Sequence, residues 1–265
     1  MNRHFFKRGI FASFVEGSSK RTMFYMFGLL SLSSLLGSDE SATTYISKKS
    51  RFLEQVSASV YNGWDSHYFT EGRDLLNGDS LIITDIQSGW RSFFSQIWYA
   101  FSPDQSYDEL QFMTRLTQTV ESFMFYAGHR HIQFPSDGLN DDETAVGVSV
   151  SNLPVGVQLS ADVYYSFEAD GFFTEITANR SFAFTERVSI NSTVIFGINR
   201  GYVSDGHDGA NHLALTVGLN YAISDSVSVI ARLTQSWEIN SDLNRPGDET
   251  LVDFFNGGIG LQWSL

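Results

Sequence analysis

The stretch VGVQLSADVYYSF, residues 155–167, decides the fold. Its odd-numbered positions, from Val155 through Ala161 to Phe167, are apolar or aromatic, whereas its even-numbered positions carry Gly, Gln, Ser, Asp, Tyr and Ser. Successive side chains of a strand point to opposite faces, so this period of two predicts a β-strand with two chemically different sides.

The same alternation recurs along the chain from residue 55 to the last residue. It is clearest in 187–200 and 211–222, where Val, Leu, Ile and Phe alternate with Ser, Asn, Thr and Gly. No stretch with the period of an amphipathic helix competes with it. We therefore predict about twelve strands, at 55–69, 80–88, 91–101, 107–118, 122–134, 143–151, 155–167, 171–184, 187–200, 211–222, 226–238 and 251–265.

The connections between these segments alternate between long and short. The long ones are rich in acidic residues and lie at 70–79, 102–106, 135–142, 168–170, 201–210 and 239–250. Short turns at one end and longer loops at the other are typical of an outer-membrane barrel, with periplasmic turns and extracellular loops. The sequence thus predicts an all-β transmembrane antiparallel up-and-down β-barrel of about 12 strands, with both ends in the periplasm.

A water-soluble β-sandwich or a lipocalin-like barrel would also show alternation. Its polar face, however, would carry Lys, Glu and Thr in water. Here the polar face is small and uncharged over long stretches, as expected for side chains that crowd a narrow lumen. Aromatic pairs near the expected strand ends, such as Trp64 with Tyr68, Trp98 with Tyr99 and Phe172 with Phe173, further favour a membrane barrel with interfacial girdles.

Composition excludes several classes of protein. The 265 residues are 42% hydrophobic and 15% aromatic, which argues against disorder, and a net charge of -13 argues against a nucleic-acid partner. The absence of cysteine excludes a disulfide scaffold, a thiolate zinc site and cysteine catalysis. No apolar run reaches roughly 18 residues, which excludes a multi-helix membrane protein.

The N-terminus has the plan of an export signal. Residues 1–21 are basic, the apolar run MFYMFGLLSLSSLL follows at 23–36, and GSDES comes next. The run is too short for a permanent membrane anchor, and a short buried helix is the alternative. We predict a cleaved signal peptide at 1–38, a short periplasmic segment at 39–54, and the barrel at 55–265.

The last strand predicts the route of assembly. Ile259, Leu261, Trp263 and Leu265 share one face and run to the final residue. The segment resembles the assembly signal of outer-membrane proteins, and the positions that match it are Asn256, Gly258, Leu261 and Trp263. The signal also includes the terminal residue, which is Leu265 here where Phe is usual. This resemblance implies that the barrel-assembly machinery is a partner.

From Ser57 to Leu265 the chain resembles the TorF family of porins. The similarity rests on Tyr68-Phe69-Thr70-Glu71-Gly72, Tyr107-Asp108-Glu109-Leu110, Phe125-Tyr126-Ala127-Gly128 leading to Phe134-Pro135, and Asn211-His212. The family usually has Arg directly before the first of those glycines, where this chain has Glu71. The resemblance implies an outer-membrane channel.

Charged residues on the polar faces are the candidate site. A charge facing lipid near mid-bilayer costs about 2–4 kcal/mol, so these residues should point inward. We predict a pore lined by Glu109, Arg115, Arg130, Asp162, Glu175 and Arg232. Mixed signs indicate weak ion preference. Arg180 falls on the apolar face, so it should reach the periplasmic interface or mark a break in register.

Catalytic and metal-binding patterns are weak. His129 and His131 share one strand face and could reach a common ligand, but the phospholipase-type His-x-Ser pattern is absent, and we expect both to lie near the outer rim. His207 is expected in a solvated loop. The acidic runs around Asp137–Glu143 and Asp205–Asp208 lack the register of an EF-hand. We predict no catalytic residues, cofactor site or metal site, and an enzyme is the third hypothesis.

The sequence therefore predicts an outer-membrane porin-like channel for passive diffusion of ions or small solutes. The alternative is a non-conducting structural or surface-interaction barrel. The expected partners are membrane lipid, lipopolysaccharide, the assembly machinery and small solutes, with no nucleic acid. Which of the two functions applies depends on how the side chains meet inside the lumen.

Overall fold

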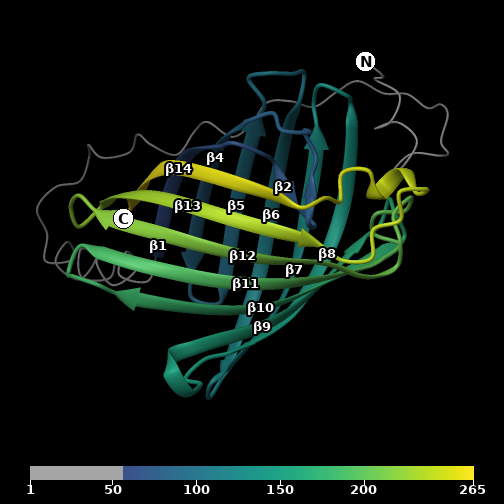
Figure 1. Cartoon of the computed structure of the whole chain (residues 1–265). Coiled ribbons are helices and arrows are strands. Elements are labelled where there is room, and N and C mark those ends of the chain that lie inside the picture. The colour runs from purple at the N-terminus through teal and green to yellow at the C-terminus, as the bar shows by residue number, and fades with distance from the viewer. Residues whose placement is uncertain (1–55) are drawn as a thin grey trace, which may run out of the picture.

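The computed structural model describes residues 56–265 and confirms the predicted antiparallel barrel (Figure 1). Each strand pairs with its neighbours in the chain, and β1 closes the barrel by pairing with both β4 and β14. The predicted signal peptide at 1–38 and the segment 39–54 lie outside the described residues. The twelve barrel strands are β1 (Val56–Asp65), β4 (Leu81–Trp90), β5 (Phe93–Phe101), β6 (Asp108–Val120), β7 (Phe123–Phe134), β8 (Leu139–Val150), β9 (Val157–Ser166), β10 (Gly171–Ala183), β11 (Val188–Arg200), β12 (Gly209–Ala222), β13 (Val227–Glu238) and β14 (Phe254–Ser264).

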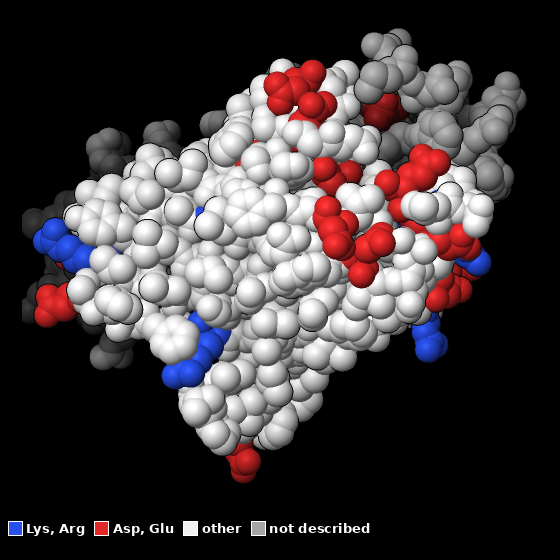
Figure 2. Space-filling view, in the orientation of Figure 1, with Lys and Arg blue, Asp and Glu red and all other residues white. Residues whose placement is uncertain are grey.

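The register puts the two chemical faces where the alternation predicts them. Between β9 and β10, Asp162 pairs with Glu175 on the inner face, and Ala161 pairs with Ile176 on the outer face. The outer face carries exposed Leu, Val, Ile and aromatic side chains, among them Leu116 and Phe112 on β6. Figure 2 shows this wall as a largely uncharged band between the two ends of the barrel. An apolar exterior with no open edge is what a hydrocarbon environment requires.

The two ends of the barrel differ in their connections. At one end the strands reverse through turns as short as residues 91–92 and 121–122, and both β1 and β14 have their chain ends there. At the other end the connections span 66–80, 102–107, 135–138, 167–170, 201–208 and 239–253.

No helix among residues 56–265 is long and apolar enough to cross a membrane.

Several strand bounds differ from those the sequence predicts. β8 begins at Leu139, so the predicted loop 135–142 shrinks to a turn at 135–138 in which Gly138 has a φ of 68° and its N–H bonds to the Phe134 carbonyl. The alternation of β8 continues through Asp141 and Asp142, which point to opposite faces. β14 begins at Phe254, because 251–253 belong to the preceding loop.

The first long connection contains a hairpin that the sequence does not predict. β1 ends at Asp65, and β2 (Phe69–Thr70) pairs with β3 (Arg73–Asp74). The two residues between them, Glu71 and Gly72, both have positive φ, 44° and 75°. This is the backbone of a type I′ turn, whose twist suits a two-residue hairpin.

This loop covers the main apolar core, which lies inside the barrel at the long-loop end. The core cluster contains Tyr68, Leu76, Leu81, Ile83, Ala100 and Tyr107. Tyr68 stacks on Trp98 with ring centroids 6.1 Å apart, and Phe173 is also buried in the interior. The prediction that Tyr68, Trp98 and Phe173 join the interfacial girdles is therefore wrong, since an inward-folded loop gives these rings an apolar partner inside the lumen.

Candidate functional site

Arg73 anchors the hairpin to the last long loop, 239–253. Its Nε donates to the Gly247 carbonyl at 2.9 Å, and its Nη2 contacts Asp248 Oδ1 at 3.2 Å. Its Nη1 donates to Asn211 Oδ1 at 3.1 Å. Arg73 is only 1% exposed, so this pairing provides the partners that a buried guanidinium needs. Burial lowers the pKa of Arg73, while Glu71 and Asp248 oppose that shift.

Asp248 links several segments at this end of the barrel. Besides Arg73, it contacts His207 Nδ1 at 2.8 Å and accepts from the backbone N–H of Asp242 at 2.9 Å. Burial acts to raise the pKa of Asp248, but hydrogen bonds from Asp242 and His207 outweigh it and leave that pKa below its usual value. The prediction that His207 is a solvated loop residue is wrong, because Asp248 holds its ring in the interior.

Close backbone contact fixes the position of the hairpin tip. A Cβ at Gly72 would lie 2.3 Å from Cγ of His212, and a Cβ at Gly197 would lie 2.3 Å from Cε1 of the same ring. The His212 ring stacks on Phe173, with centroids 6.2 Å apart. Glycine is therefore required at position 72 both for the positive φ and for the approach to the barrel wall.

Two carboxylates on the inner wall receive the hairpin and a neighbouring loop. Glu109 on β6 accepts from Tyr68 at 2.7 Å and also bonds to Tyr107 and Gln111. Glu143 on β8 pairs with Arg130, whose Nε lies 2.6 Å from Glu143 Oε2, and accepts from the Tyr202 hydroxyl. These bonds neutralise Arg130 locally and fix the walls around the hairpin.

The other predicted lumen residues also occupy inner positions. Asp162 accepts from Tyr126 at 2.6 Å, and Arg232 pairs with Asp65. Arg115 lies between two rings, 4.6 Å from the centroid of Phe94 and 5.0 Å from that of Tyr126. The set Glu109, Arg115, Arg130, Asp162, Glu175 and Arg232 thus shares the inner face. That these six line a conducting pore stays a prediction.

Arg180 is on the outer face, as the alternation predicts. The pairing of β10 with both neighbours is continuous through Arg180, so no register break occurs there. Its guanidinium carbon lies 4.1 Å from the centroid of the Phe182 ring, one position closer to the short turns on the same face. This direction agrees with a side chain that reaches toward the membrane interface.

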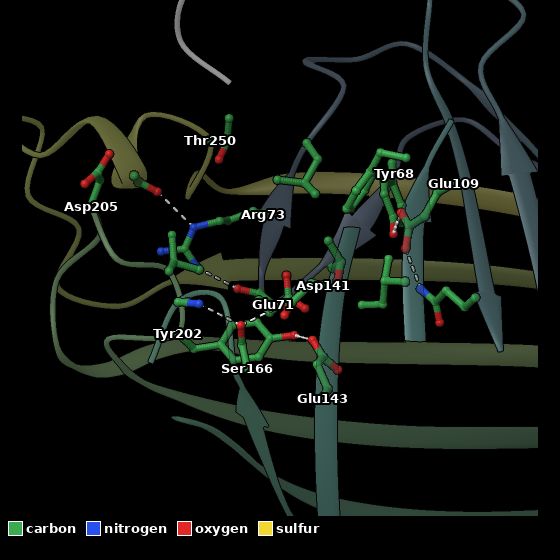
Figure 3. A pocket seen from close by; sticks show the side chains of 18 of the residues that line it. Tyr68, Glu71, Arg73, Glu109, Asp141, Glu143, Ser166, Tyr202, Asp205 and Thr250 are labelled. Carbon is green, nitrogen blue, oxygen red and sulfur yellow. Dashed lines mark hydrogen bonds between the residues drawn. The ribbon is translucent and has the colours of Figure 1, made fainter. Parts of the chain in front are cut away.

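Two cavities occupy the lumen at the long-loop end. The outer one, about 280 Å³, is lined by hairpin residues and by wall residues such as Glu109, Asp141 and Glu143 (Figure 3). The inner one, about 200 Å³, is lined by Phe69, Thr70, Glu71, Arg130, Tyr164, Phe173, Glu175 and Tyr202. Because Thr70, Glu71, Arg130 and Tyr202 line both, the hairpin tip lies at the boundary between them.

Carboxylates outnumber cations in this lumen. The sequence reasoning missed Asp65, Glu71, Asp85, Asp141 and Glu143, of which all but Glu71 occupy inner strand positions. The alternation could have found Asp65, which shares the parity of Gly63, and Glu143, which shares that of Ala145, Gly147 and Ser149. It gave no such signal for Asp85, whose neighbours of the same parity include Leu81 and Ile83, or for Asp141, which the sequence places in a loop. Glu71 had no such signal, since its position depends on how the loop folds.

The outer histidines and the C-terminal residues lie on the wall. His131 Nδ1 and His129 Nε2 contact Asp142 Oδ1 at 2.9 and 3.2 Å on the outer face of β7 and β8. Within residues 56–265, no group of three or more His, Asp or Glu side chains could hold a metal ion. Leu261 and Trp263 on β14, and Leu265 directly after it, are exposed outward. Asn256 is buried and accepts from Ser66, and Gly258 lies against Asp65. Their role in assembly is untested.

Comparison with known proteins gives structural similarity only. The sequence matches no family model and no curated protein. The KdgM porin superposes with a TM-score of 0.55 at 9% identity, covering 78% of this chain and 99% of that one. The NanC porin gives 0.54 at 10% identity, covering 78% and 100%. Such low identity supports the fold alone, and the resemblance to the TorF family stays a prediction. The chain has the fold of these two porins.

Proposed function

We propose that this protein is an outer-membrane channel for passive diffusion of ions and small solutes. The observation that carries the proposal is the contrast between the two faces of the barrel. The outside is apolar, and the inside holds charged side chains around two adjoining cavities. An ionisable residue has a low-cost place inside a hydrated lumen but not in lipid, which agrees with solute passage along the inner face.

The proposed location includes export and assembly. A signal peptide at 1–38 would be removed, and the barrel-assembly machinery would recognise β14. The apolar outer wall would contact lipid and lipopolysaccharide. The mature chain should then be found in the outer-membrane fraction and migrate differently on gels before and after heating. A soluble periplasmic monomer would contradict this proposal.

Conductance in planar bilayers tests transport directly. The folded hairpin narrows the mouth, so we expect small but discrete single-channel events from the native protein. Replacing residues 68–78 by a short Gly-Ser turn should widen the path and raise the conductance. Heat-modifiability of the shortened variant verifies that its barrel is intact.

A second candidate function is a non-conducting barrel whose long loops bind a partner. It is favoured by the buried ion pair of Arg73 with Asp248, which ties the hairpin to the loop 239–253 across the mouth. Absence of channels in the native protein, together with conduction by the shortened variant, would support this plugged barrel. Discrete native channels would support diffusion.

A further inference from the structure

We infer that the inner cavity binds small organic ammonium ions and gives the channel a preference for cations, with Glu71 and Glu175 as the recognising groups. The preference in conduction rests on the proposed channel function. The binding site itself is a feature of the folded barrel and can be tested without transport.

The hairpin turn places one of the two carboxylates. Glu71 has a φ of 44° and occupies the first position of the type I′ turn, and it lines both cavities. Two features of the next residues fix its position. Gly72 packs closely against the ring of His212, and Arg73 forms an ion pair with Asp248. Glu71 therefore lies on the path between the outer and inner cavities.

The second carboxylate is deeply enclosed and lacks a protein partner. Glu175 lines the inner cavity, and no hydrogen bond or ion pair of its side chain is found among residues 56–265. It stands directly opposite Asp162 in the pairing of β9 with β10. Asp162 has its own donors in Tyr126 and Ser160, whereas Glu175 has none. Like charges directly opposite each other destabilise a sheet, and a bound cation would relieve this repulsion.

Aromatic rings complete the lining of the cavity, and one of them, Tyr164, already has a cation over its face, because the guanidinium carbon of Arg130 lies 5.6 Å from its centroid. Phe69, Tyr164, Phe173 and Tyr202 line the same cavity as the two carboxylates. The face of an aromatic ring attracts a cation, most strongly where both are partly removed from water. The cavity volume of about 200 Å³ exceeds the roughly 150 Å³ that accommodates benzene in an engineered apolar cavity. A benzylammonium-sized ligand therefore fits the chemistry and the scale of the site.

The cation in the wall does not reverse this preference. Arg130 also lines the cavity, but its guanidinium is bonded to Glu143 through both Nε and Nη2. The pair carries no net charge, which leaves the charges of Glu71 and Glu175 to dominate the local field. The two carboxylates would repel an anionic ligand, and Arg130 is already paired with Glu143. Anionic ligands should therefore not bind in the inner cavity.

Calorimetry on the folded barrel in non-ionic detergent tests the site. Benzylammonium should bind, whereas the neutral benzyl alcohol and the anionic benzoate should not. E175Q retains the size of the side chain and should weaken benzylammonium binding by at least tenfold, as should E71Q. The control D137N alters an exposed carboxylate in the turn 135–138 and should change the affinity by less than twofold.

Equal binding of benzyl alcohol, or unchanged binding by E175Q, would overturn the site. Heat-modifiability of each variant ensures that a loss of binding is not a loss of fold. In bilayers, the reversal potential under a KCl gradient should indicate cation preference, and E71Q with E175Q should reduce it. Channels without cation preference would refute the inference and leave diffusion standing. Binding without channels would refute diffusion and leave the site standing.

Discussion

The two ends of this barrel are built from the same strands but carry different chemistry. The loops at one end contain thirteen carboxylates and two arginines, whereas the turns at the other contain Glu121, Glu186 and Asp225 with Arg91 and Arg187. Figure 2 shows acidic side chains concentrated toward the long-loop end. The thirteen are Glu71, Asp74, Asp79, Asp104, Asp137, Glu168, Asp170, Asp205, Asp208, Asp242, Asp248, Glu249 and Asp253.

The difference shows what each end has to accomplish. The short turns only reverse the chain, and residues such as Arg91 and Glu121 adopt positive φ to do so within two residues. The long loops fold back on the barrel and bring buried polar groups together, as Asp248 does with Arg73 and His207. Assembly should therefore depend on the strand ends near the turns, and conduction on the loops.

The largest effect should come from the final strand, near the turns. Replacing Trp263 and Leu265 by alanine removes exposed apolar groups from the lipid-facing side, so we expect little or no folded, heat-modifiable protein. The matched pair Gln262 and Ser264 alternates with them, and its replacement by alanine should be tolerated. The measurement is the folded fraction after insertion into vesicles. Equal tolerance of both pairs would show that the outer face of β14 does not direct assembly.

Breaking the anchor of the hairpin should have the next largest effect, at the loop end. R73A removes one partner of Asp248 and the bond to Gly247, so the hairpin should be released and the single-channel conductance should rise severalfold. R187A, in an exposed short turn, is the control and should leave conductance unchanged. If R73A conducts like the native protein, the hairpin does not restrict the path.

Removing the lumen arginines should alter selectivity more than assembly. Replacing Arg115, Arg130 and Arg232 by glutamine should shift the reversal potential further toward cations. R130Q and R232Q should each contribute more than R115Q, because they leave Glu143 and Asp65 without their cation. Arg115 lies between two rings and has no ion pair among residues 56–265. An unchanged reversal potential in the triple variant would argue against these residues as the pore lining.

The smallest expected effect is the pH dependence of selectivity. Burial raises the pKa of Glu71, with Glu143 adding to the shift and Thr70, Arg130 and Arg73 opposing it. The groups facing Glu71 across the inner cavity are Glu175, Arg130 and Tyr202. As the pH falls through this raised pKa, Glu71 becomes neutral. Cation preference should therefore begin to decline at a higher pH than for an exposed glutamate, and E71Q should remove that part of the decline.

The sequence by itself determined the barrel, the two ends and the face of most strand residues. The reason is that the period of two is local, so each side chain's direction follows from its parity once the strand exists. Asp162 and Glu175 were placed inward because a charge that faces lipid is costly. Arg180 was placed outward because it shares the parity of Ile176, Ala178 and Phe182. Errors at this level were strand ends such as Leu139 and the rings of Trp98 and Phe173, which the sequence predicts at the membrane interface and which lie inside the barrel.

Only the tertiary structure decided the site. The pairing of Arg73 with Asp248 joins residues 175 positions apart, and the position of Glu71 depends on a hairpin that folds into the lumen. Alternation is a local property of the sequence, so it does not predict contacts between residues that are far apart in the chain. These contacts form for two reasons. The buried guanidinium of Arg73 and the apolar cluster under residues 66–80 need partners from other loops. Closure of the barrel also brings β1 next to β14, and with them the loops that these strands lead to.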